Sequence, residues 1–196
     1  MRKLCVYCGS SGGNRPEYAA VCRQLADAMM RERIDLVYGG GSVGMMGSIA
    51  DAVIEGGGQV IGVIPRFMVD KELMHPGISE AHIVDSMHQR KTIMAEFADG
   101  FIALPGGVGT MEELFEVWTW RVLKLHQKPC ALLNVGGYYD SLVSFIDGMV
   151  DNGFLKPKFR EMLIVDDDPD RIIDRMQEIG PSSDEVGRLD DLWARS

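Results

Sequence analysis

The sequence predicts one α/β domain built on a parallel sheet with helices on both of its faces. Short apolar runs alternate along the chain with segments whose apolar residues recur at helical spacing. Turns rich in glycine or containing proline separate most of these segments. The apolar runs are continuous, which is typical of strands that are buried on both faces. These three observations favour a single doubly wound, Rossmann-like domain.

Each expected element follows from its local pattern. Strands are expected at 4–8, 34–38, 59–64, 81–84, 101–104, 130–135 and 163–165. Helices are expected at 16–33, 44–55, 87–98, 110–125, 138–151 and 170–179. Residues 65–80 are irregular and predict a loop. The polar, acidic residues 181–196 predict a flexible C-terminal tail, so the domain is expected to span residues 1–180.

Length and charge narrow the classes of function. The chain has 196 residues, of which 46% are hydrophobic and 25% charged, as in a soluble globular protein of one domain. Its formal net charge of −9 argues against a nucleic-acid partner and against binding to a membrane surface. Residues 161–196 hold 11 acidic and 4 basic residues, so the rest of the chain is nearly neutral. An anionic ligand is therefore still possible there.

The cysteines and the N-terminus predict a cytoplasmic protein without a metal site. The apolar run 4–8 stops at Gly9, too early for a signal peptide, and no run approaches the ~18 apolar residues of a membrane span. Cys5 and Cys8 form a C-x-x-C pair, but their offset of three places them on opposite faces of a strand. No second pair completes a zinc site. Buried structural thiols are the expected role of all four cysteines, Cys5, Cys8, Cys22 and Cys130.

Three glycine-rich loops should meet at one edge of the sheet. They follow the first, second and fifth expected strands, and the carboxyl ends of parallel strands share an edge. Gly39-x-Gly41-x-x-Gly44 matches a dinucleotide-binding pattern only weakly, because it lies in the second strand–helix turn and lacks the acidic residue expected about 20 positions later. The chain contains no Gly-Lys dipeptide, which excludes a Walker A loop.

The loop Pro105-Gly-Gly-Val-Gly-Thr110 is the stronger indication of a phosphate site. Its glycines can turn their N–H groups outward, and the helix that follows adds donors and the positive end of its dipole. The alternative is an ordinary tight turn in which Thr110 caps the helix and Glu113 completes a capping box.

Charged side chains occupy unexpected positions on the two helices of this region. The expected core-facing line of helix 87–98 is Met87, Arg90, Met94 and Phe97. A buried arginine there needs an anionic partner, either a carboxylate or a ligand phosphate. The neighbouring Lys91 is expected to face solvent rather than the same crevice. Glu113 and Glu116 share a face of the next helix. They could simply favour its N-terminus, or they could bind sugar hydroxyls and stabilise an oxocarbenium ion.

The histidines give no further site. His75, His82, His88 and His126 lack the spacing of metal ligands, so each is expected to be solvated or to form a local hydrogen bond.

Taken together, the motifs resemble those of a known enzyme family. Residues 87–91 read M-H-Q-R-K and residues 105–113 read P-G-G-V-G-T-M-E-E. Residues 8–11, 38–47 and 132–139 add further similarity, so that the resemblance covers about residues 3–165. These motifs resemble the LOG ("lonely guy") family of cytokinin riboside 5′-monophosphate phosphoribohydrolases, whose members are often labelled lysine decarboxylases.

The resemblance implies an enzyme that splits the N-glycosidic bond of N6-substituted AMP into free base and ribose 5-phosphate. It implies a homodimer without metal or organic cofactor, in which Arg90 and Glu113 are the catalytic pair. It also implies that the substrate is bound by Gly9, Ser10, Gly40, Gly41, Glu72, Met87, Lys91, Gly106, Gly107, Val108, Gly109, Thr110, Met111, Glu112 and Thr119.

Three alternatives compete with this interpretation. Molybdenum-cofactor carriers share the Y-G-G-G loop but would not need the Arg90/Glu113 pair. A general AMP nucleosidase stays open as an alternative, because no residues of the sequence identify a pocket for an N6 substituent. A lysine decarboxylase is disfavoured, because no lysine lies in a context that suggests a pyridoxal-phosphate Schiff base.

Overall fold

The computed structural model describes residues 1–69 and 73–179. Seven parallel strands of this part form one sheet in the order β4-β3-β2-β1-β5-β6-β7. The strands are β1 (Lys3–Tyr7), β2 (Asp35–Tyr38), β3 (Val60–Pro65), β4 (Glu80–Val84), β5 (Gly100–Ala103), β6 (Cys130–Leu133) and β7 (Leu163–Asp166). The doubly wound α/β fold that the sequence predicts is confirmed.

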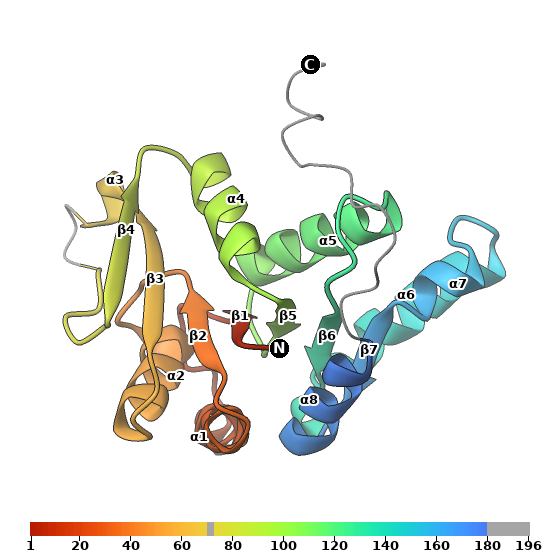
Figure 1. Ribbon diagram of the computed structural model, residues 1–196. Coiled ribbons are helices and arrows are strands. Elements are labelled where there is room, and N and C mark those ends of the chain that lie inside the picture. The colour runs from red at the N-terminus through yellow and green to blue at the C-terminus, as the bar shows by residue number, and fades with distance from the viewer. Residues whose placement is uncertain (70–72, 180–196) are drawn as a thin grey trace.

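The helices form a layer on each face of the sheet. They are α1 (Pro16–Arg31), α2 (Gly44–Glu55), α3 (Arg66–Val69), α4 (Met87–Phe97), α5 (Val108–Val122), the 3₁₀ turn η1 (Val135–Gly137), α6 (Asp140–Asp151), α7 (Pro157–Arg160) and α8 (Pro169–Glu178). In Figure 1, α1, α2 and α8 lie on one side of the sheet, and α4, α5 and α6 lie on the other.

The alternation of side chains along β1 explains the two cores. Leu4 and Val6 pack against the layer of α1, α2 and α8, whereas Cys5 and Tyr7 pack against the layer of α4, α5 and α6. Cys8 belongs to the first core, so the C-x-x-C pair is split between the faces as expected. All four cysteines are buried and free.

The strand order places a topological switch point between β1 and β5. From β1 the chain adds β2, β3 and β4 on one side, then returns to add β5, β6 and β7 on the other. Ligands of such sheets bind in the crevice at the carboxyl edge beside the switch point. The loops that follow β1 and β5 are the loops at 8–15 and 104–107.

The structure corrects four details of the sequence prediction. Helix α5 begins at Val108 with Gly107 as its N-cap, so Thr110 lies inside the helix and is not a cap. The turn α7 was not expected, since four residues are too few to show helical periodicity; Pro157 occupies its first turn. The expected loop at 65–80 contains α3, and η1 replaces the end of the strand expected at 130–135. The tail expected at 181–196 lies outside the described residues.

In the part of the chain that the structure describes, no helix is both long enough and apolar enough to cross a membrane.

Candidate active site

The start of α4 is set by a capping box that determines where Arg90 lies. Ser86 accepts a hydrogen bond from the Gln89 N–H at 3.1 Å, and the Gln89 side chain accepts one from the Asp85 N–H at 2.9 Å. This S-x-x-Q pattern is readable in the sequence and marks a helix N-terminus. Arg90 therefore lies one turn into α4, and its side chain reaches the carboxyl edge of the sheet.

The Arg90 guanidinium is buried against three segments. Its Nε donates a hydrogen bond to the Val63 carbonyl of β3 at 3.1 Å, and its Nη1 lies 2.9 Å from Glu113 Oε1 of α5. The third segment is the loop after β2, where a Cβ added at Gly39 would lie only 2.0 Å from Arg90 Nη2. Glycine at position 39 thus leaves the space that the guanidinium fills. The expected buried arginine is present, with a carboxylate as its partner.

Glu113 is buried and is held beside the arginine without a directed hydrogen bond. Its side chain is 10% exposed, and Oε1 accepts no hydrogen bond in the described part of the chain although Arg90 is so near. Burial raises the pKa of Glu113, Arg90 lowers it, and the charge of Glu112 raises it further, with a net upward shift. A carboxylate that is buried beside a guanidinium and a glycine-rich loop is suited to face a developing positive charge.

A second ion cluster lies next to this pair. Lys91 Nζ contacts Glu112 Oε1 and lies 3.0 Å from Glu116 Oε1. Although burial lowers the pKa of Lys91, its hydrogen bonds to the two glutamates raise it above the usual range, so that Lys91 remains a cation. The expectation that Lys91 faces solvent was wrong. The two carboxylates of α5 supply the partners that a buried ammonium needs.

The buried face of α4 differs accordingly from the predicted line. It contains Arg90, Lys91, Met94 and Ala95, whereas Met87 is 38% exposed and Phe97 is only half-buried. The predicted line thus placed Arg90 and Met94 correctly but missed Lys91, which is buried in ion pairs with two glutamates.

The three glycine-rich loops contact one another, as the sequence predicts. The Gly9 N–H donates to the Pro105 carbonyl at 3.1 Å, and the Met45 N–H donates to the Gly9 carbonyl at 3.1 Å. Gly44 has a φ of +60°, and a Cβ there would lie 2.3 Å from the Ser10 carbonyl carbon. The loop after β2 also contacts the Arg90 guanidinium, through Gly39. The structure therefore brings Gly9, Ser10, Gly40 and Gly41 to the same edge as the Arg90–Glu113 pair.

The loop before α5 presents its backbone to solvent. Gly107, Val108 and Gly109 are exposed, with Val108 at 88%, while Thr110 is buried and closes against Gly106. The N–H groups at the start of this 15-residue helix have no intrahelical acceptors, and the positive end of the dipole lies here. Such a loop can bind a phosphate without any basic side chain.

The remaining predicted site residues differ in their distance from the Arg90–Glu113 pair and in their exposure to solvent. Met87 borders the pair, with its Sδ 4.0 Å from Arg90 Nη1, and Met111 is half-buried on the first turn of α5. Thr119 is exposed one turn beyond Glu116 on the same side of α5. Glu72 lies outside the described residues.

Sequence reasoning missed three groups that support the site. Gly39 and the Val63 carbonyl seat Arg90, and Tyr138 donates a hydrogen bond to the Gly106 carbonyl. The sequence pattern placed Gly39 only in a weak match to a dinucleotide-binding motif. The tyrosines after Gly136-Gly137 follow a strand at the same edge, which was the available signal for Tyr138.

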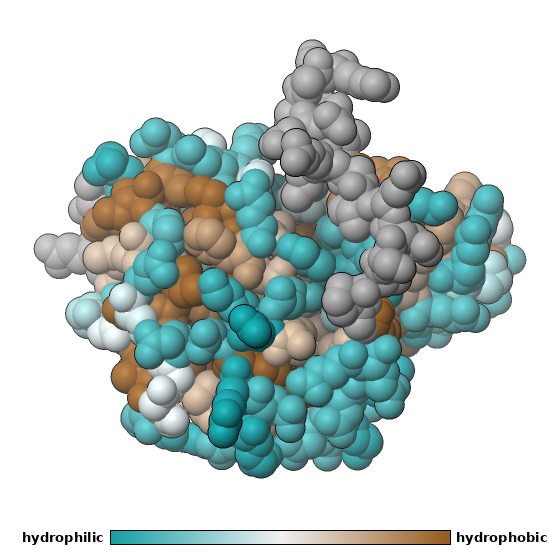
Figure 2. Space-filling model, in the orientation of Figure 1, coloured by the Kyte–Doolittle hydropathy of each residue, from teal (hydrophilic) through white to brown (hydrophobic). Residues whose placement is uncertain are grey.

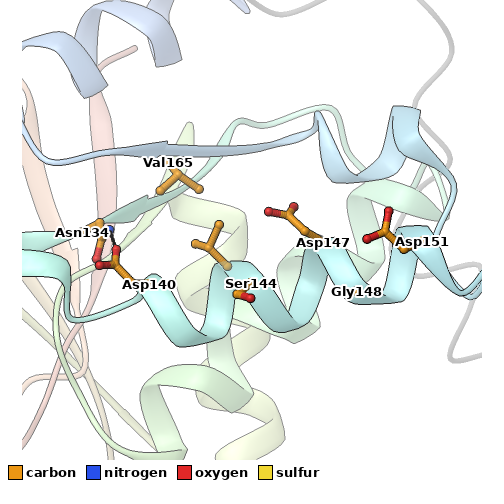
Figure 3. A pocket seen from close by; sticks show the side chains of 8 residues that line it. Asn134, Asp140, Ser144, Asp147, Gly148, Asp151 and Val165 are labelled. Carbon is orange, nitrogen blue, oxygen red and sulfur yellow. Dashed lines mark hydrogen bonds between the residues drawn. The ribbon is translucent and has the colours of Figure 1, made fainter.

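A separate hollow of about 600 Å³ lies between α6 and β7 (Figure 3). Asp140, Asp147 and Asp151 line it together with Asn134 and Val165. Its carboxylates would repel a phosphate, and it includes none of the predicted site residues. Within residues 1–69 and 73–179, moreover, no group of three His, Cys, Asp or Glu side chains could hold a metal ion. The absence of cofactors stays a prediction.

Comparisons with known proteins connect this geometry to a family. A family model described as "Possible lysine decarboxylase" matches residues 46–176. Cytokinin riboside 5′-monophosphate phosphoribohydrolase LOG7 of Arabidopsis thaliana is 48% identical over 94% of this chain and 85% of its own length. The chain belongs to the LOG family. LOG3 of the same plant is 46% identical over 94% of this chain and 86% of its own length.

Solved structures extend the likeness of this LOG-family chain to proteins of other kinds. The molybdenum cofactor carrier protein of Chlamydomonas reinhardtii has a TM-score of 0.70 at 19% identity, covering 91% of this chain and 98% of its own. The molybdenum cofactor binding protein of Rippkaea orientalis has a TM-score of 0.69 at 20% identity, covering 91% and 97%. At these identities the likeness concerns the fold alone.

Proposed function

We propose that this LOG-family protein hydrolyses the N-glycosidic bond of cytokinin riboside 5′-monophosphates, releasing the free base and ribose 5-phosphate. The observation that carries the proposal is the buried Arg90–Glu113 pair, 2.9 Å apart, at the edge where the exposed glycine loop begins α5. A phosphate on that loop would bring the attached ribose toward the carboxylate. The names of the relatives supply the substrate class.

The loop 106–110 is proposed to bind the 5′-phosphate. Its exposed backbone supplies N–H donors, and the N-terminus of α5 supplies the positive dipole. The phosphate is the part of the substrate that does not react, so this binding serves to place the ribose.

Glu113 is proposed to act at the reacting carbon. As the bond between C1′ and the base nitrogen breaks, its electrons leave with the base and positive charge develops on the ribose ring. The Glu113 carboxylate would accept hydrogen bonds from the ribose hydroxyls and stabilise that charge. Water then forms the new bond to C1′ and gives up a proton, and the departing base gains one. Arg90 keeps Glu113 in place and favours its ionised form.

The other residues implied by the resemblance are proposed to contact the substrate around this centre. Gly9, Ser10, Gly40 and Gly41 belong to the loops that meet there, and Val108, Met111 and Glu112 belong to the first turns of α5. The proposed substrate contacts also include Met87, Lys91, Thr119 and Glu72. Lys91 is engaged by Glu112 and Glu116, so its contribution is proposed to run through those carboxylates.

Base release separates this proposal from its alternatives. The protein is incubated in parallel with AMP and with isopentenyladenosine monophosphate, and the bases are separated by chromatography. Release of isopentenyladenine in preference to adenine supports the proposal. Adenine alone would identify a general AMP nucleosidase, and the release of neither base would favour a nucleotide carrier.

We also propose a homodimer located in the cytoplasm. Figure 2 shows an apolar area over α3, β4 and α4, and the exposed apolar residues of these elements are Phe67, Ile83 and Met87. Four buried, free cysteines suit a reducing compartment. Light scattering should give twice the 21.7 kDa of one chain, and a mass of one chain at micromolar concentration would contradict the dimer.

A further inference from the structure

The side chain of Tyr138 is hydrogen-bonded to a backbone carbonyl of the loop that is proposed to bind the phosphate. Its hydroxyl donates a hydrogen bond to the Gly106 carbonyl, 2.6 Å away. The ring packs edge-on against Tyr18 and Tyr139, with centroids 5.7 and 4.9 Å away. These neighbours fix the ring, although 41% of the residue is exposed. Tyr138 is therefore a rigid donor that reaches the loop from the segment between η1 and α6.

Three consecutive carbonyl groups of the loop accept hydrogen bonds from donors in two segments, the loop after β1 and the pair Tyr138–Tyr139. Tyr139 Oη donates to the Leu104 carbonyl at 2.5 Å, the Gly9 N–H to the Pro105 carbonyl at 3.1 Å, and Tyr138 Oη to the Gly106 carbonyl. In a planar trans peptide, the carbonyl and the N–H of the next residue point in opposite directions. A donor that holds a carbonyl therefore also aims the following N–H.

This rule gives the two tyrosines different roles. The Gly106 carbonyl is followed by the Gly107 N–H, so Tyr138 directs that N–H away from itself. The Leu104 carbonyl is followed by Pro105, which has no N–H to aim. A Cβ added at Gly107 would meet nothing within 4 Å, so no packing holds the Gly107 side of this peptide, whereas Thr110 and Gly9 pack closely against its Gly106 side. The Gly107 N–H depends on Tyr138 for its direction.

We propose that Tyr138 is a positioning residue for the substrate phosphate, because its hydroxyl holds the Gly106–Gly107 peptide with the Gly107 N–H turned toward the ligand. The inference rests on the proposed phosphate role of this loop. Without the hydroxyl, glycine on both sides of the peptide lets it rotate, and the phosphate must then order it on binding. Tyr138 thus acts through the backbone.

The test compares Tyr138→Phe with Tyr139→Phe, each of which removes one hydroxyl bound to a loop carbonyl. Titration calorimetry with ribose 5-phosphate measures phosphate binding, and steady-state kinetics with isopentenyladenosine monophosphate measures KM and kcat. Tyr138→Phe should raise the Kd and the KM about fivefold and change kcat by less than about twofold, the loss expected for one hydrogen bond in uniform binding. Its melting temperature should stay close to that of the wild type, because water can replace the partly exposed hydroxyl.

Tyr139→Phe is the matched control. It leaves the Leu104 carbonyl buried and unpaired, so it should lower the melting temperature by about 3 °C while the Kd of ribose 5-phosphate stays at the wild-type value. An unchanged Kd in Tyr138→Phe would overturn the inference. An equal rise in both variants would also overturn it, since the hydroxyls would then act only through loop stability.

Binding and turnover distinguish this inference from the proposed function. If the wild type releases no base but Tyr138→Phe still weakens the binding of ribose 5-phosphate, the proposed function fails and the positioning role stands. If the wild type binds no ribose 5-phosphate, the positioning role is wrong whatever the turnover.

Discussion

Glu113 is a carboxylate whose surroundings oppose its charge. Burial raises its pKa above the usual 4.5, and Arg90 only partly offsets this. If catalysis needs the ionised carboxylate, protonation at low pH removes activity. The profile of kcat against pH should therefore fall on its acidic side with an apparent pKa above 4.5, the ordinary value for glutamate.

Glu112 provides an internal check on that profile. Its negative charge raises the pKa of Glu113, so Glu112→Gln should move the acidic limb of kcat to lower pH. A limb at or below 4.5 in the wild type, or no shift in the variant, would show that another group controls the acidic side.

Single residues also show where sequence reasoning succeeds and where it stops. The position of Arg90 on the inward side of α4 is predictable from periodicity, and so is its need for an anionic partner. The burial of Lys91 is not, because it depends on Glu112 and Glu116, which are more than 20 positions away. Ion pairs between helices leave no periodic pattern in either helix.

At the scale of elements, the loop after β2 leaves the space in which a side chain of α4, Arg90, is buried. Gly39 leaves room for the guanidinium, so the Y-G-G-G sequence serves Arg90 as well as the turn. Gly39→Ala should displace Arg90, because the new Cβ would lie 2.0 Å from Nη2, and kcat/KM should fall by roughly 10²-fold.

Gly12→Ala is a suitable control for that change. Gly12 lies in the loop after β1, where an added Cβ meets nothing within 4 Å, and its kcat/KM should stay within about twofold of wild type. Circular dichroism verifies that both variants are folded. Wild-type turnover in a folded Gly39→Ala protein would show that the position of Arg90 is not critical.

The elements themselves were largely predictable, and their ends less so. Helix α4 begins at Met87, as the sequence predicts, and the side chains of Ser86 and Gln89 cap its start. Helix α5 begins two residues earlier than predicted, because Gly107 serves as N-cap and the apparent capping box of Thr110 and Glu113 is not formed. Glu113 contacts Arg90 instead. The capping box that the sequence suggests does not form, because Glu113 pairs with Arg90 on α4.

At the scale of the whole molecule, the net charge of −9 is compatible with an anionic substrate. The excess is concentrated in residues 161–196, which follow all the glycine-rich motifs in the sequence, and the proposed phosphate site depends on backbone N–H groups rather than on basic side chains. We propose that residues 1–180 carry the whole activity.

Deleting residues 181–196 tests that proposal. The shortened protein should retain kcat/KM within about twofold of the full chain, because none of the proposed contacts comes from these residues. A loss of tenfold or more would assign this segment a part in the site.

The most direct test of the central claim is the turnover of isopentenyladenosine monophosphate by Glu113→Gln. The amide keeps the size of the side chain but cannot carry the charge that is proposed to stabilise the ribose cation. We predict that the variant binds ribose 5-phosphate with nearly the wild-type Kd while kcat falls by about 10³-fold. Base release by the folded variant at close to the wild-type rate would contradict the account.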